Sequence, residues 1–246
     1  MPPNFGDDLM LGPVASPRGA QNTDGPSVME LGAGPMGRVY VWDVVAATSN
    51  STGLAVTQII ATSATAALTP AGAATVVVDK VAGGTCIQLD VPRVLTVRTN
   101  NVGDVTQQVI FSGYDQYWKP MTALVTIATT AMTNTLKAFK YVKSVSFNTV
   151  VTGSVALGFG EVLGAPYRIM SKDYVVFNYN GTAGVMASVT AGDTTPATNA
   201  TGEVRGLITL ATASDGAKRL VGHHALSALQ CGPNATATGL YGVTQA

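Results

Sequence analysis

Hydrophobic and polar residues alternate along several stretches in the middle of the chain. Between residues 94 and 100, Leu95 and Val97 point to one side, whereas Thr96 and Arg98 point to the other. A period of two is typical of half-buried antiparallel strands. Two later apolar faces follow the same alternation, at Met121, Ala123, Val125 and Ile127 and at Phe139, Tyr141, Val145 and Phe147.

Short stretches of this kind recur along most of the chain, with turn residues between them. We expect strands at residues 54–61, 75–78, 85–91, 94–100, 105–112, 121–128, 139–147, 154–159, 174–179, 185–190, 203–210 and 237–241. Residues 217–228 fit a strand or a short helix, and polar loops are expected at 61–72 and 192–202. This spacing predicts an all-β fold, an antiparallel β-sandwich or a barrel-like body.

The stretch from Arg38 to Ala46 differs from the others because it is apolar on both faces. Strands that are covered on both faces have this composition, so we expect either a central strand or one that another subunit covers. Tyr40 and Trp42 are its aromatic residues, and they are candidates for contact with a partner.

The first 36 residues hold half of the 12 prolines of the chain, with glycines between them. Proline-rich sequence cannot build a helix or a central strand, so we expect a disordered tail or an extended arm ordered by a neighbour. Apolar residues favour the arm, with Leu9, Leu11, Met29 and Leu31 as candidate partner contacts. We therefore divide the chain into an N-terminal arm, 1–36, and a β body, 37–246, with two sub-regions that would divide near 192–202.

The chain carries few charges, and they cancel. Charged residues make up 11% of the sequence, with 14 basic and 14 acidic side chains, whereas about 25% is average. Nothing in this balance attracts nucleic acid or an anionic membrane. Because a net charge near zero favours association, we expect a surface that partners cover; a solvated surface rich in Thr and Ser is the alternative.

The ends and the cysteines of the sequence indicate a protein that assembles in a cytoplasm. The first residues lack a basic region followed by an apolar core, so no signal peptide is expected. No apolar run approaches the roughly 18 residues of a membrane helix. Cys86 and Cys231 are expected to be free buried thiols.

No pattern in the sequence selects a catalytic, cofactor or metal site. Residues 32–37 match GxGxxG, but a proline interrupts the motif and a strand follows it, so we expect a hinge. His223 and His224 are adjacent and would point to opposite faces of a strand, which prevents joint binding of one metal. Nothing selects a catalytic pair among the acids Asp79, Asp90, Asp104 and Asp115.

An aromatic loop at residues 113–120 is the remaining candidate for binding. Tyr114, Tyr117 and Trp118 surround Asp115, and aromatic rings beside one acid can form a sugar-binding platform. The alternative is a connecting loop whose aromatic residues pack on the body or on a partner.

Three segments of the sequence resemble β-rich virion structural proteins of tailed bacteriophages. Residues 109–122 are similar to the phrase V-x-G-x-D-x-x-G-x-P-x-x-E, 137–145 to K-x-F-x-x-V-x-S-V, and 158–168 to G-x-G-x-x-L-G-L-P-Y-R. The chain departs from the first phrase at Trp118, where the family has glycine, and at Ala123 and Leu124, where an acid is usual.

This resemblance implies a virion structural protein without catalytic residues. We expect a head decoration or cement protein on the capsid surface, which staples neighbouring subunits of the major capsid protein and associates with itself. The first alternative is a tail, neck or fibre component of the same particle. The second is a glycan-binding module or hydrolase that uses the aromatic loop.

Overall fold

The computed structural model describes residues 36–60, 65–66, 69–72, 74–128, 130–183, 186–195, 197–227 and 245. Within these residues nearly all regular structure is antiparallel β, and the only helical element is a 3-10 turn, η3 (Lys172–Tyr174). The all-β prediction is therefore confirmed. Several predictions lie outside the described residues: the arm with Leu9, Leu11, Met29 and Leu31, residues 32–35 of the hinge, the strand at 237–241 and Cys231. The last two hinge residues, Met36 and Gly37, are part of the first strand of the body.

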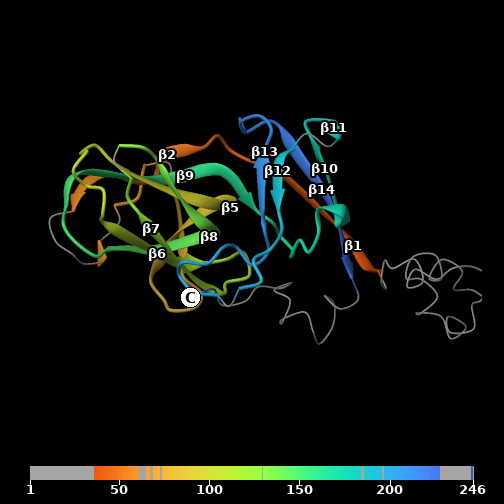
Figure 1. The fold of residues 1–246 in the computed structure, drawn as a ribbon, viewed down its shortest axis with the longest axis horizontal. Coiled ribbons are helices and arrows are strands. Elements are labelled where there is room, and N and C mark those ends of the chain that lie inside the picture. Colours follow the sequence, from red (N-terminus) through yellow and green to blue (C-terminus); the bar gives the residue numbers. More distant parts are fainter. Residues whose placement is uncertain are drawn as a thin grey trace, which may run out of the picture.

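A sheet of ten strands, curled into a half-barrel, forms the larger part of the molecule (Figure 1). Seven strands run in the order β12-β13-β9-β5-β8-β6-β7, while β2 pairs with β9, β3 with β8 and β4 with β5. Their bounds are β2 (Asn50–Ile60), β3 (Thr65–Ala66), β4 (Thr75–Val78), β5 (Thr85–Thr99), β6 (Gln108–Tyr114), β7 (Pro120–Thr126), β8 (Thr133–Phe147), β9 (Val151–Gly164), β12 (Met186–Thr190) and β13 (Leu207–Leu210).

A smaller sheet of four strands lies at one end of the molecule, beyond β12 and β13 (Figure 1). Its order is β1-β14-β10-β11, and all of its pairs are antiparallel. The bounds are β1 (Met36–Val45), β10 (Val175–Tyr179), β11 (Thr182–Ala183) and β14 (Arg219–Ser227). Residues 217–228, which fit a strand or a helix, therefore contain a strand.

The predicted break between residues 91 and 94 is wrong, because β5 runs through it as one strand. Pro92 has no N–H group to donate, and the register with β8 shifts between Gln88 and Arg93 rather than ending there. The alternation expected at residues 94–100 holds for Leu95, Val97 and Arg98 but fails at Thr96. The strand β5 lies between β8 and β9, and Thr96, expected on the open side, is only 2% exposed.

The apolar stretch 38–46 lies at the edge of a sheet, not at its centre. Among the described residues, β1 pairs with β14 on one side only. The central-strand prediction is therefore wrong, and coverage by another subunit stays a prediction. In β14, His223 is exposed and His224 is buried, which confirms that the two histidines point to opposite faces.

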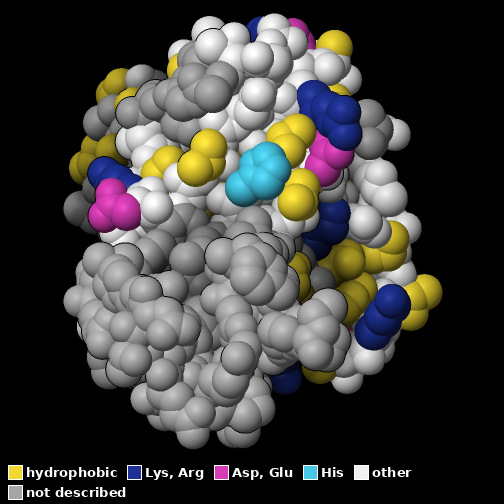
Figure 2. All heavy atoms as spheres, turned by 90° about the vertical axis from the view of Figure 1, so that its right-hand side faces the viewer, with side chains coloured by type: hydrophobic (Ala, Val, Ile, Leu, Met, Phe, Trp, Pro, Cys, Tyr) yellow, Lys and Arg dark blue, Asp and Glu magenta, His cyan; other side chains and the backbone are white. Residues whose placement is uncertain are grey.

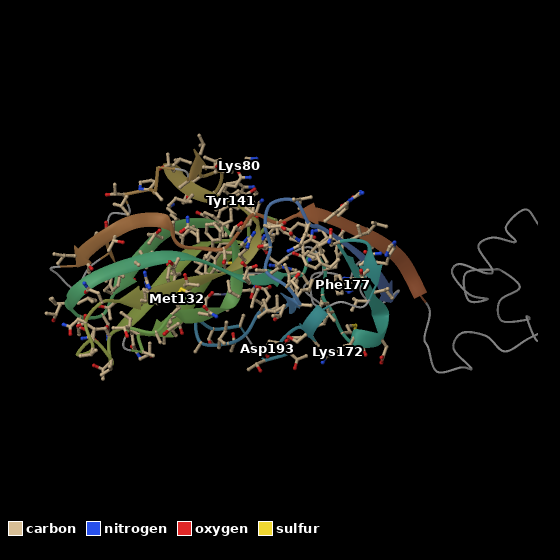
Figure 3. All side chains as sticks on the ribbon, turned by 90° about the horizontal axis from the view of Figure 1, so that it is seen from above. Lys80, Met132, Tyr141, Lys172, Phe177 and Asp193 are labelled. Atoms are coloured by element: carbon tan, nitrogen blue, oxygen red, sulfur yellow. The ribbon has the colours of Figure 1, made fainter. Side chains whose placement is uncertain are left out.

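Two apolar clusters fill the interior, one under each sheet. The first lies within the half-barrel and includes Leu95, Phe111 and Phe139. The second includes Ile169 and Phe177 and joins the small sheet to β9 and β13 (Figure 3). The body is therefore continuous, with the small sheet packed on one end of the large one.

Arg93 ties the two sheets together at their junction. Its guanidinium is completely buried and pairs with Asp90 through two hydrogen bonds of 2.7 and 2.8 Å. It also donates to the carbonyl oxygen of Gly160 in β9 and to that of Ala47, which follows β1. One side chain of β5 thus holds the link between the two sheets.

Candidate interaction surfaces

The aromatic loop packs on its own chain. Tyr114 is 4% exposed and donates its hydroxyl hydrogen to Asp79 at 2.8 Å, so it does not form part of the surface. Tyr117 is half-buried and donates to the carbonyl oxygen of Pro166 at 2.7 Å. The prediction of Tyr114 as an exposed partner contact is wrong, because the interior uses both its ring and its hydroxyl.

Trp118 occupies the position where the phage family has glycine, and its backbone is left-handed, with a φ of 61°. Glycine adopts this conformation without steric cost. The indole stacks on Tyr141, with ring centroids 3.9 Å apart, and Lys80 Nζ lies 5.3 Å from its centroid. Lys80 and Tyr141 lie on the same side of the molecule (Figure 3). The ring faces that a sugar would need are thus in contact with the chain itself.

The left-handed backbone at Trp118 predicts a difference between two substitutions. Both Trp118→Ala and Trp118→Gly remove the stack on Tyr141, but only glycine also removes the backbone strain. We expect the glycine variant to be more stable than the alanine variant by about 1 kcal/mol, measured by chemical denaturation. Equal stabilities would mean that the loop leaves the left-handed conformation once the ring is gone.

Below the loop lies a buried ionic cluster. Arg205 donates to Asp115 Oδ2 at 2.8 Å and lies 3.2 Å from Glu203 Oε1, and all three side chains are almost fully buried. Asp115 also accepts the backbone N–H groups of Tyr117 and Lys119, which fixes the turn. Burial raises the pKa of Asp115, against the opposing effect of Arg205. The acid that the sugar-platform hypothesis needed is therefore part of the internal structure.

Lys137 lies in the same region and holds the end of the chain in place. Its buried ammonium donates to the carbonyl oxygens of Thr122, Thr198 and Gln245 at 2.8, 2.6 and 2.6 Å. Burial lowers its pKa from 10.5 to about 8. No sequence pattern could have indicated this arrangement, because the three acceptors are backbone atoms from distant segments.

The remaining candidate acids also have internal partners. Asp104 accepts from Thr99 and from the N–H groups of Thr152 and Gly153, and these bonds hold its pKa below the usual range despite burial. Asp79 is also buried, but it accepts hydrogen bonds from Tyr114 and Lys143, and these bonds lower its pKa as well. Each of the four candidate acids, Asp79, Asp90, Asp104 and Asp115, thus accepts hydrogen bonds from its own chain.

The part of the chain that the structure describes lacks two features, a cluster of metal-binding side chains and a membrane-crossing helix. It contains no group of three or more His, Cys, Asp or Glu side chains placed to hold a metal ion. It also contains no helix with the length and hydropathy needed to cross a membrane. Cys86 is buried and free.

The clearest candidate for partner contact is the outer face of the small sheet. Val41, His223 and Val176 lie side by side across β1, β14 and β10. The two valines are 61% and 60% exposed, and Val45 on β1 is also exposed. Figure 2 shows a histidine surrounded by hydrophobic side chains on this end of the molecule. We call Val41, Val45, Val176 and His223 the outer patch.

The predicted contact residues of β1 lie on the opposite face from the outer patch. Tyr40 is half-buried, and its ring centroid is 4.5 Å from that of Tyr167. Trp42 is half-buried and packs against the second apolar cluster. Whether Tyr40 and Trp42 contact a partner stays a prediction. The exposed face of β1 carries Val41, Asp43 and Val45 instead, and Asp43 pairs with Arg219 of β14.

The fold and its surfaces define an all-β protein whose buried charges have internal partners and whose small sheet has an exposed aliphatic face. No model of a protein family matches the chain, and neither does any curated protein or solved structure. The resemblance to phage virion proteins thus stays a prediction from the sequence.

Proposed function

We propose that the protein is a structural component of a bacteriophage virion, a decoration or cement protein that binds neighbouring subunits of the major capsid protein. The observation that carries the proposal is the outer patch, where Val41 and Val176 expose aliphatic surface on a sheet face. Contiguous exposed apolar surface marks sites of protein contact. The resemblance of residues 109–122, 137–145 and 158–168 to phage virion proteins is the reason for proposing a bacteriophage particle.

The electrostatics of the body support a role in assembly. Arg93, Lys137 and Arg205 are buried, and each is used to join segments that are distant in the sequence. Such bonds hold distant segments of a scaffold together. In the proposed mechanism, the outer patch and the N-terminal segment contact two different capsid subunits, which couples them mechanically.

The proposal predicts where the chain is found in the particle. In purified virions of the phage that encodes it, we expect a copy number comparable to that of the major capsid protein, measured by quantitative mass spectrometry. A cryo-EM map of these virions should show the β body on the outer capsid surface. A few copies confined to the tail would favour the tail alternative, and absence from the particle would refute a virion role.

A truncated variant provides the control for the stapling mechanism. Deletion of residues 1–35 preserves the whole of β1, which begins at Met36. We expect the truncated body to keep its fold and to show reduced occupancy on capsids after heating. Normal occupancy would contradict a role of the N-terminal segment in stapling.

A further inference from the structure

Gln245 is held beside β7, at the end of the strand order of the large sheet. Its backbone N–H group donates to the carbonyl oxygen of Pro120, and its carbonyl oxygen accepts the N–H group of Thr122, both at 2.9 Å. These bonds belong to a parallel bridge between Gln245 and Met121. Because β7 is the last strand in that order, Gln245 lies where an extended peptide would add a further strand.

The side chain of Gln245 is enclosed as well, since the residue is completely buried. Its Nε2 group donates to Glu203 Oε1 at 3.0 Å, and its Oε1 atom accepts the backbone N–H group of Val204 at 3.3 Å. The ammonium of Lys137 donates to the carbonyl oxygen of Gln245 at 2.6 Å. Each polar group of this residue, on the backbone and on the side chain, thus has a partner.

The two charged groups that meet this residue are oriented by other contacts. Glu203 Oε2 accepts the backbone N–H group of Ala138 at 3.1 Å, and Glu203 Oε1 lies 3.2 Å from Arg205. Lys137 also donates to the carbonyl oxygen of Thr198 at 2.6 Å. The β body itself therefore holds both groups in position, as a preorganised binding site requires.

The chemistry of the enclosure selects glutamine. The ionised carboxylate of Glu203 can only accept hydrogen bonds, and the backbone N–H group of Val204 can only donate one. The side chain at position 245 must therefore offer one donor and one acceptor, as the amide of glutamine does. Glutamate has the same shape but only acceptors when it is ionised, and methionine offers a single weak acceptor.

We infer that β7, Lys137 and residues 203–204 form a binding site for an extended segment that presents glutamine, and that Gln245 occupies this site from the same chain. The backbone bonds add the segment to the edge of β7, and the amide bonds determine which residue is bound. Addition of a strand to a sheet edge is an established mode of peptide recognition. The bound segment also covers part of the β7 edge, which protects that edge from pairing with other chains.

Amide hydrogen exchange of the Thr122 N–H group reports the occupancy of the site in the full chain, because this group is bonded to Gln245. We expect Gln245→Glu and Gln245→Met each to raise its exchange rate at pH 7 by about tenfold or more. The matched control is Gln108→Glu, the same substitution at an exposed position, which should change the rate by less than about threefold. A rate in either Gln245 variant within about threefold of the wild type would overturn the inference, as would an equal effect of the control.

An exchange of the two side chains provides a second test that does not depend on the stability of one variant. In the double variant Glu203→Gln with Gln245→Glu, the amide and the carboxylate change places, so the hydrogen bond between the two positions and the charge of the site are kept. We expect Thr122 to exchange about fivefold more slowly in the double variant than in Gln245→Glu alone, a coupling that double-mutant cycles measure.

Equal exchange rates in the double variant and in Gln245→Glu would refute the pairing of the amide with Glu203. If Gln245→Glu does not fold, recovery of the fold in the double variant is the expected result, and failure of both variants to fold refutes the same pairing. Because these assays contain no capsid, their outcome is separate from that of the virion experiment.

Discussion

Replacement of Arg205 by methionine is expected to lower the free energy of unfolding by about 3–5 kcal/mol, since removing one partner of a buried ion pair leaves the other uncompensated. Methionine retains much of the apolar length of the side chain but removes the charge that faces Asp115 and Glu203. Both carboxylates would then remain almost fully buried without their cation. The turn that Asp115 fixes and the segment that carries Glu203 would lose their connection.

Chemical denaturation measures this effect, and Arg98→Met is the matched control. Arg98 is also a β-sheet arginine, but it is exposed, so the same substitution should change stability by no more than about 0.5 kcal/mol. A loss of less than about 1 kcal/mol in Arg205→Met would contradict the role of this cluster, since it would mean that the carboxylates take up protons or water without cost.

Replacement of Gly158 by alanine is expected to cost about 3 kcal/mol, at the upper end for overpacking, because the added methyl group meets backbone rather than a movable side chain. Its Cβ would lie 2.1 Å from the carbonyl oxygen of Asn50 and 2.5 Å from Cα of Ser51. Gly158 pairs with Thr96 in β5, on the central part of the large sheet. The start of β2 would have to move away from β9.

Gly72→Ala is the matched control for this substitution. A Cβ at Gly72 meets nothing within 4 Å, and its backbone is not left-handed. We expect a change of less than about 1 kcal/mol there, which can be stabilising because alanine restricts the unfolded chain. Equal stabilities of Gly158→Ala and Gly72→Ala in thermal and chemical unfolding would contradict the prediction. They would mean that β2 can move away from β9 without loss of stability.

Much of the fold follows from local pattern. The sequence located β4 at residues 75–78, and strand geometry placed His223 and His224 on opposite faces, because adjacent residues of any strand point to opposite sides. The aromatic loop at residues 113–120 could be selected locally too, because three aromatic residues surround one acid there.

The sequence by itself determined the fold class and most strand positions, since these depend on neighbours a few residues away. It did not determine every side-chain direction: a register shift between β6 and β8 puts Val142, and not Tyr141, into the core with Phe139. Only the tertiary structure decided that β1 lies at an edge and that Asp115 meets Arg205, 90 residues further along. It also decided that valines of β1 and β10 come together with His223 of β14 in the outer patch. Strand order and register are set by the packing of the whole chain, so alternation within one strand predicts which face a residue occupies but not what lies opposite.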